Sequence, residues 1–182
     1  MTLYVIDPIL LLRGNHTSHQ QRGQIMSTRS TLTIKTDTTA INFYRHMDGY
    51  VAEAGQTLVQ LMDKVNANNN DWVNAPPRFI KEIMKQEYKS ATYPSIYELI
   101  DNPERHGDRQ FHYAVTFGIV GHVKITVTEW KLNLDERSER KEVIFSGIYQ
   151  EYKDFVAKEV EIMDQRRQAI DALHENKKNP IV

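Results

Sequence analysis

Alternation of apolar and polar residues along the chain predicts four of about five expected β-strands. In these four, apolar residues recur at every second position, which is the period of a strand with one buried face. The five expected segments are 30–36, 40–46, 111–117, 123–128 and 143–148. Short polar or glycine-containing connections at 37–39 and 118–121 join the first four strands in pairs. We therefore expect two antiparallel hairpins and one additional strand.

A second period, with apolar residues every three or four positions, predicts amphipathic helices. These helices are expected at about 51–65, 79–88 and 150–174. Asp48 is the expected N-cap of the first helix, because its carboxylate can accept hydrogen bonds from free amides of the first turn. Pro76 and Pro77 suit the first turn of the second helix. Ser95–Glu98 has the spacing of a capping box and predicts one short helical turn.

The order of these elements indicates an α+β fold, because strands and helices come in runs and do not alternate one for one. We expect a mostly antiparallel sheet of about five strands, with two or three helices on one face and a long C-terminal helix. Residues 26–176 are expected to form this single domain, and 177–182 a fraying tail. Charged residues at 134–141 predict a loop before the fifth strand.

The first 25 residues differ from the rest of the chain. Residues 1–12 are mostly apolar but lack the basic start and small-residue cleavage site of a secretory signal, and 14–23 are polar and without a period. A strand-like segment follows Met26 at once. We expect Met26 to be the natural start, which makes 1–25 a wrongly assigned start. The alternative is a disordered arm that packs on a partner.

Composition narrows the class of protein. The chain has 182 residues, 40% of them hydrophobic and 26% charged, as in ordinary globular domains. There is no cysteine, which excludes disulfides and thiolate chemistry and suits the cytoplasm. The formal net charge of −1 gives no overall attraction to nucleic acid or anionic lipid. No apolar run approaches the ~20 residues of a membrane helix. We therefore expect a cytoplasmic protein with no membrane partner and no nucleic-acid partner.

One short segment combines several chemically useful side chains. Arg45, His46 and Asp48 lie within four residues at the expected corner between the second strand and the first helix, flanked by Tyr44 and Tyr50. If the strand continues to Asp48, His46 and Asp48 point the same way and form a base with its orienting carboxylate. Arg45 and the helix N-terminus would favour an anionic ligand. The alternative is purely structural: a cap, a turn and packing aromatics.

No other segment predicts a metal site or a cofactor. His106, His112 and His122 lie near the second hairpin. His112 and His122 flank its turn and could lie across from each other, but these two imidazoles fall short of the three or four ligands a metal site needs. Glycine-rich phosphate loops and catalytic serine or zinc motifs are absent from the sequence. We therefore expect no metal and no cofactor.

Two motifs resemble a group of small uncharacterised proteins carried by phages and prophages. These proteins open with a Ser-Thr-Arg-(Ala/Ser)-Thr strand and continue into an Arg-His-x-Asp-Gly-Tyr corner. The corresponding residues here are 27–31 and 45–50. The resemblance implies an accessory protein of a mobile element, and it carries over no catalytic residue.

The sequence as a whole favours a binding protein over an enzyme. The expected function is that of a phage accessory protein that binds and modulates a host protein or complex, an inhibitor of a defence system being one such role. Two alternatives stay open at the corner: a binder of a small phosphorylated ligand or nucleotide at Arg45, His46 and Asp48, and an enzyme with His46 as general base. A homodimer is also expected, because exposed hairpin edges need cover.

Overall fold

The computed structural model describes residues 28–66, 72, 74–86, 96–118, 122–133 and 138–178. Its strands are β1 (Ser30–Lys35), β2 (Ala40–Arg45), β3 (Tyr97–Ile100), β4 (Phe111–Phe117), β5 (Val123–Asn133) and β6 (Ser138–Ile148). Its helices are the π-helical turn η2 (Val51–Gly55), α1 (Gln56–Asn66), α2 (Ala75–Met84), the 3₁₀ turn η3 (Pro103–Arg105) and α3 (Tyr149–Lys178). The expected leader at 1–25 lies outside the described residues.

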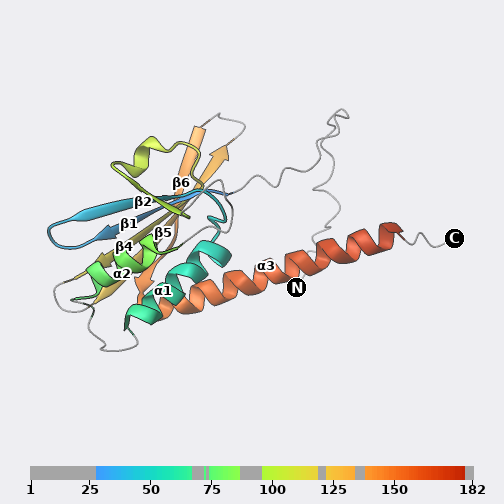
Figure 1. The fold of residues 1–182 in the computed structure, drawn as a ribbon. Coiled ribbons are helices and arrows are strands. Elements are labelled where there is room, and N and C mark those ends of the chain that lie inside the picture. Colours follow the sequence, from blue (N-terminus) through green and yellow to red (C-terminus); the bar gives the residue numbers. More distant parts are fainter. Residues whose placement is uncertain are drawn as a thin grey trace, which may run out of the picture.

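The strands form one mixed sheet with helices packed against it (Figure 1). Its six strands follow the order β3-β2-β1-β4-β5-β6. The hairpins β1–β2 and β4–β5 and the pair β5–β6 are antiparallel, as expected. The α+β class is confirmed. The expectation of about five mostly antiparallel strands is wrong in two respects: a sixth strand is present, and the central pair β1–β4 is parallel.

The additional strand is β3, where the capping-box spacing predicted a helical turn. Tyr97–Ile100 pairs antiparallel with β2 and forms one edge of the sheet. The local signal at Ser95–Glu98 was therefore misleading. Four residues give too short a window for the period of a strand to show, and the pairing with β2 stabilises β3 in its place.

The fifth expected strand also begins earlier than predicted. β6 starts at Ser138 and pairs with β5 from Ser138↔Asn133 through Ile148↔Lys124. The charged segment 139–142 was read as part of a loop. It is the outer half of an edge strand, where charged side chains face solvent and oppose unwanted strand pairing.

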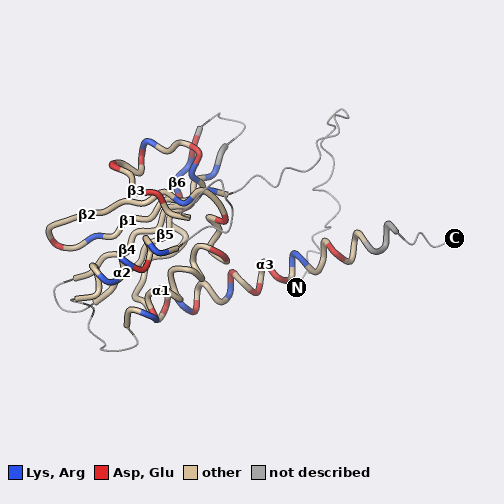
Figure 2. The backbone as a smooth tube through the Cα atoms, viewed as in Figure 1, with Lys and Arg blue, Asp and Glu red and all other residues tan. Residues whose placement is uncertain are grey.

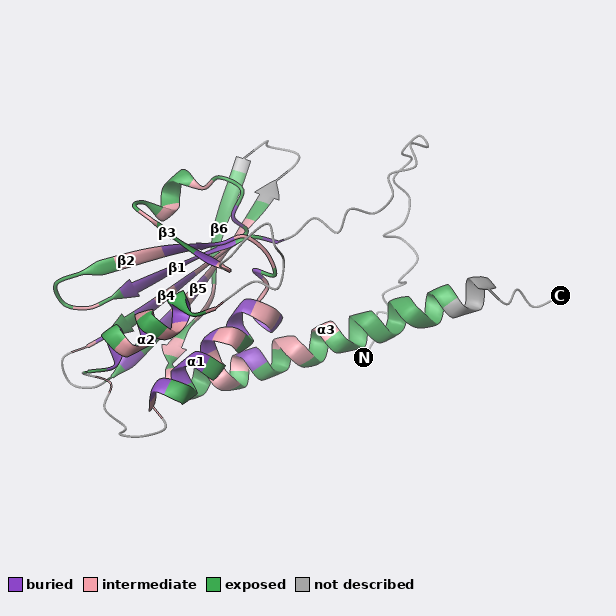
Figure 3. Ribbon diagram, in the orientation of Figure 1, coloured by how far each residue is buried: buried purple, intermediate pink, exposed green. Residues whose placement is uncertain are grey.

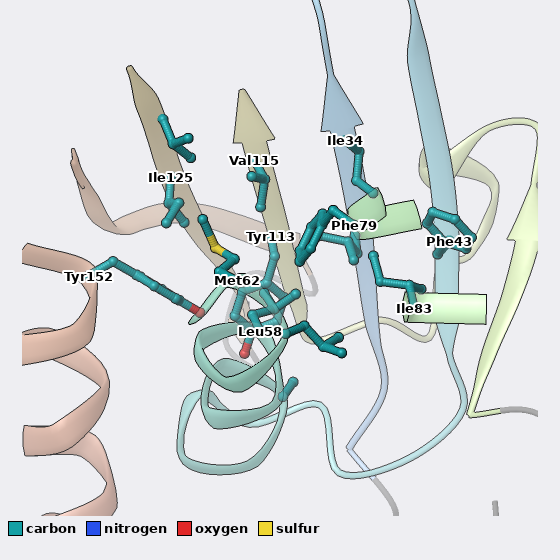
Figure 4. Packing of buried hydrophobic residues seen from close by; sticks show 14 of the residues in the cluster. Ile34, Phe43, Leu58, Met62, Phe79, Ile83, Tyr113, Val115, Ile125 and Tyr152 are labelled. Atoms are coloured by element: carbon teal, nitrogen blue, oxygen red, sulfur yellow. The ribbon is translucent and has the colours of Figure 1, made fainter. Parts of the chain in front are cut away.

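Hydrophobic side chains from the helices and from one face of the sheet meet in a single core (Figure 4). Register places Leu32 opposite both Phe43 and Tyr113, so neighbouring strands direct their apolar residues to the same face. The largest fully buried side chains are Leu32, Ile34, Phe43, Leu58, Met62, Phe79, Ile83, Tyr113, Val115, Ile125, Val127 and Tyr152. The alternating apolar positions expected from the sequence are therefore the core positions.

Helix α3 follows β6 without a loop and extends far past the sheet (Figure 1). Its first turns are held in place, because Tyr152 and Val156 are buried in the core. Every described residue from Asp164 to His174 is exposed (Figure 3). Helical structure continues to Lys178, so the expected tail at 177–182 begins as helix, and 179–182 lie outside the described residues.

Candidate functional site

The corner after β2 is fixed by its backbone. Asp48 adopts a left-handed conformation with φ of 53°, which aspartate tolerates better than most residues. The N–H of Gly49 donates to the carbonyl of Thr28 at 2.8 Å, and its own carbonyl accepts from the buried Tyr113 hydroxyl at 2.9 Å. A Cβ on Gly49 would lie 2.7 Å from the Arg29 carbonyl carbon. Glycine is therefore required where the corner crosses the chain leading into β1.

Arg45 points into the protein and not toward a ligand. It is 5% exposed, and its Nε donates to the Met47 carbonyl at 2.8 Å. Its Nη1 donates to the Tyr97 hydroxyl at 3.1 Å and to Thr57 Oγ1 at 3.3 Å. The guanidinium carbon lies 5.4 Å from the centre of the Tyr97 ring. Arg45 thus joins the corner, the first helix and β3.

His46 and Asp48 do not share a strand face, because β2 ends at Arg45. His46 Nε2 lies 3.1 Å from Glu98 Oε2 of β3. Asp48 is also not the helix cap: Tyr50 occupies the N-cap position, without a capping hydrogen bond from its side chain. The helix begins there with the π turn η2. The predicted pairing of His46 with Asp48 rested on a longer strand than the one that forms.

Tyr44 lies at the centre of a polar cluster on the opposite face of the sheet. Its hydroxyl donates to Asp108 Oδ2 at 2.9 Å, and Arg29 also pairs with this carboxylate. The ring of His106 stacks on Tyr44 at a centroid distance of 4.3 Å, and His46 contacts its edge at 4.9 Å. The segment between β3 and β4 is thereby held against the sheet.

The environment of this cluster fixes its protonation. Burial and the hydrogen bond to Asp108 raise the pKa of the Tyr44 hydroxyl well above its usual range. Burial works against ionisation of Asp108, but hydrogen bonds from Tyr44 and Arg29 outweigh it and hold the pKa of Asp108 below its usual value. Near neutral pH the pair is therefore a neutral phenol donating to a carboxylate, which is a stable structural contact.

A second set of contacts holds the same segment farther along the sheet. The Arg109 guanidinium lies 4.5 Å from the Trp130 ring centre and donates to Glu104 at 2.8 Å. His112 Nδ1 is 2.8 Å from Thr31 Oγ1. Burial and the charge of Arg109 lower the pKa of His112 to about 4. His112 is therefore a neutral packing residue at neutral pH.

The corner residues have a common structural effect: they position the edge strand β3. Tyr97 receives a hydrogen bond from Arg45, and Glu98 lies against His46. Beyond them, Asn42 Nδ2 donates to the Asp101 carbonyl at 3.1 Å. Three of the five predicted site residues, Tyr44, Arg45 and His46, thus lie beside or contact β3 and the segment that follows it.

Strand β3 presents an apolar surface, which we call the β3-edge patch. It consists of Ile41, Ile80, Met84, Leu99 and Ile100, which line a hollow of about 390 Å³. Leu99 and Met84 are each 63% exposed. This patch was not predicted, because β3 was not recognised as a strand. The only available signal was the short apolar pair Leu99-Ile100.

Tyr50, the last predicted site residue, lines a different hollow of about 530 Å³, which we call the α3 groove. The groove lies between the middle of α3 and residues of β4, β5 and β6. Its apolar lining includes Phe111, Ile144, Phe155, Ile162 and Met163, and its charged lining consists of Glu129, Glu159 and Arg166. The helical spacing of the apolar α3 residues was visible in the sequence, but it predicted only packing against the core and not a groove.

Within the described ranges, no group of three or more histidine or acidic side chains is arranged to hold a metal ion. No helix in the same ranges has the length and apolar character needed to cross a membrane.

No protein-family model, curated protein or solved structure matches the chain. Function therefore has to be argued from the surfaces described above.

Proposed function

We propose that the chain is an accessory protein of a phage or prophage that binds and modulates a host protein or complex, with the β3-edge patch as its contact surface. The observation that carries the binding function is the exposure of Leu99 and Met84 beside a hollow at a sheet edge. Contiguous exposed apolar side chains are typical of protein interaction sites. The mobile-element origin rests on the resemblance at residues 27–31 and 45–50.

The geometry of the patch favours an extended segment of the host protein. β3 is an edge strand, so its outer side can pair with an added strand. Such pairing supplies backbone hydrogen bonds, and the hollow beside Leu99 would take an apolar side chain of the added segment. Residues of the corner stabilise β3 before binding, which reduces the entropy that is lost when a partner docks.

The two alternatives at the corner receive less support from its contacts. A phosphate binder needs an accessible cation, and the Arg45 guanidinium is buried beside Tyr97. A general base needs an orienting group and access to substrate, and the carboxylate that His46 contacts is that of the exposed Glu98 on an edge strand. Proteins that bind macromolecules do not require either arrangement.

The test is affinity capture from host lysate followed by binding measurements with the purified captured protein. Leu99→Asp combined with Met84→Asp places charge in the hollow, and we expect it to weaken binding at least tenfold, about 1.4 kcal/mol. Val143→Asp is the matched control. Val143 is 60% exposed on β6, away from the patch, and its replacement is expected to leave binding unchanged.

Two outcomes would overturn the proposal. One is that no host protein binds the purified wild-type chain. The other is that the Leu99/Met84 variant, with an unchanged circular dichroism spectrum, binds as tightly as wild type.

A further inference from the structure

From its middle outward, α3 carries an apolar stripe that the body of the protein does not cover. Ile162, Ile170 and Leu173 are all exposed, and their spacing places them on one side of the helix. Arg167 donates to Glu53 of η2 at 2.8 Å, and this ion pair is the last contact with the body that the described part of the chain shows. From there α3 extends alone into solvent (Figure 1).

This stripe is continuous with the α3 groove. Phe155, Ile162 and Met163 line the groove, and Ile170 and Leu173 continue the same side of α3 beyond it. An isolated helical segment of about 15 residues is marginal in water, because most helix stability in proteins comes from packing of the apolar side. The outer half of α3 therefore requires a packing partner.

We infer that the partner is a second copy of this chain, with the two α3 helices packed antiparallel about a two-fold axis. Each copy has both a groove beside the inner half of α3 and an uncovered stripe on the outer half. In an antiparallel pair, the stripe of one copy enters the groove of the other, and the reverse contact is identical. A two-fold axis requires this kind of self-complementary surface.

Charge along the helix favours the antiparallel direction over the parallel one. The inner half, 149–163, has four acidic and two basic residues, and the outer half, 164–178, has three acidic and four basic residues. Both signs occur on the described part of α3 (Figure 2). Antiparallel packing places the acidic half of one helix beside the basic half of the other. Parallel packing would place halves of the same sign together.

The groove has both signs of charge. Its charged lining consists of Glu129, Glu159 and Arg166 of the same copy. A single antiparallel register places Phe155 opposite Leu173 and Glu159 opposite Ala169 of the second copy. The same register places Arg166 opposite Ile162 of the second copy, one helical turn from that copy's Glu159.

The paired helices supply about half of a standard dimer contact. Thirty helical residues span about 45 Å with a width of about 10 Å. The strip covered on each copy is thus about 450 Å², against the ~800 Å² per partner of a standard interface. Tyr50 and Trp130 at the groove wall add further area.

The first experiment measures the mass of the full chain in solution. Light scattering during size exclusion at tens of micromolar is expected to give twice the chain mass of 21.2 kDa. Ile170→Asp combined with Leu173→Asp should give the single-chain mass. The same measurement on Val143→Asp should still give the dimer, because Val143 is an exposed residue of β6 outside the groove.

The second experiment tests the direction of packing. Because the chain has no cysteine, single cysteines report individual contacts without background. An equal mixture of Glu159→Cys and Ala169→Cys chains should form a disulfide-linked pair on mild oxidation, at least tenfold more than either variant alone. A disulfide needs Cα atoms within about 7 Å, which only the antiparallel register provides for these two positions.

Three outcomes would overturn the inference. A wild-type chain that is monomeric at tens of micromolar would do so. The same holds if the chain is monomeric and hydrogen exchange shows that residues 1–27 protect the stripe. A dimer that survives the Ile170/Leu173 substitutions would place the interface elsewhere. Efficient cross-linking of Ala169→Cys with itself would indicate parallel packing. None of these experiments alters the β3-edge patch, so their failure leaves the proposed function unaffected.

Discussion

Gly49 occupies a position where the structure has no room for a methyl group. Its ideal Cβ would lie within 3 Å of backbone atoms of Arg29 and Ser30. Gly49→Ala is therefore expected to lower the free energy of unfolding by about 1–3 kcal/mol, the usual range for overpacking. Gly107→Ala is the control, because nothing lies within 4 Å of its Cβ. Urea unfolding of both variants measures the difference, and equal stabilities would contradict the steric argument.

Arg45 is expected to contribute to stability and not to ligand affinity. Arg45→Met keeps much of the side-chain volume but removes the hydrogen bonds to Met47, Thr57 and Tyr97. Loss of these bonds should cost about 2–4 kcal/mol, because buried acceptors lose their donor. The rate of amide hydrogen exchange should increase most in β3. The exposed Arg105→Met is the control, and unchanged protection of β3 would contradict the role we assign to Arg45.

His112 gives the protein a pH dependence with a definite sign. Its pKa is about 4 in the folded protein and about 6.5 in an unfolded chain. Below pH 6.5 the unfolded state takes up the proton first, so stability falls from pH 6.5 to about 4 and then levels off. The contribution of His112 that is lost is about 3 kcal/mol. Unfolding of His112→Gln should show a shallower slope over this window, and an equal slope would exclude His112 as its source.

At the scale of elements, the junction between β6 and α3 sets the direction of the long helix. Ile148 ends the strand and Tyr149 begins the helix. The Ile148 N–H donates to the Glu151 carboxylate at 3.0 Å. The Tyr149 hydroxyl lies 3.0 Å from the Val59 carbonyl and 2.7 Å from Asp63 Oδ1, both of α1. The junction thus fixes α3 against α1 before the helix leaves the body.

Removal of the Tyr149 hydroxyl tests this junction. Tyr149→Phe keeps the ring but loses the hydrogen bond to α1, and we expect a loss of about 1 kcal/mol in unfolding free energy. Tyr50→Phe is the control, since the contact described for Tyr50 is that of its ring with Phe111. Thermal unfolding of the two variants provides the comparison. Equal melting temperatures would show that the Tyr149 hydroxyl does not stabilise the junction.

At the scale of the whole molecule, sequence periodicity was sufficient to predict the elements that are long enough to show a period and that bury one face. β1, β2, β4 and β5 were all predicted by their alternation, and α1, α2 and α3 by their helical period. β3 was missed because four residues carry too little periodic signal. The parallel pairing of β1 with β4 was missed because it depends on a connection that crosses two strands, and no local pattern encodes that.

The sequence indicated which residues gather at the corner after β2, but it did not indicate which residues they contact. The alternation of β2 puts Arg45 on the same face as Phe43, which is the core face, and not on a face open to an anionic ligand. The pairing of His46 with Asp48 assumed that β2 continues through Asp48. The actual partners of Arg45 and His46 are Tyr97 and Glu98, about fifty residues later in the chain. Such distant partners cannot be inferred from the spacing of neighbouring residues.

The parallel pair β1–β4 also has a consequence for synthesis on the ribosome. Thr31 and its neighbour His112 are separated by 81 positions. At 5–20 residues per second, β1 therefore waits about 4–16 s for its central partner to be translated. Throughout that interval Leu32 and Ile34 lack their β4 neighbours Tyr113 and Val115. A nascent chain of this fold thus passes through a long stage in which apolar strand residues are open to aggregation.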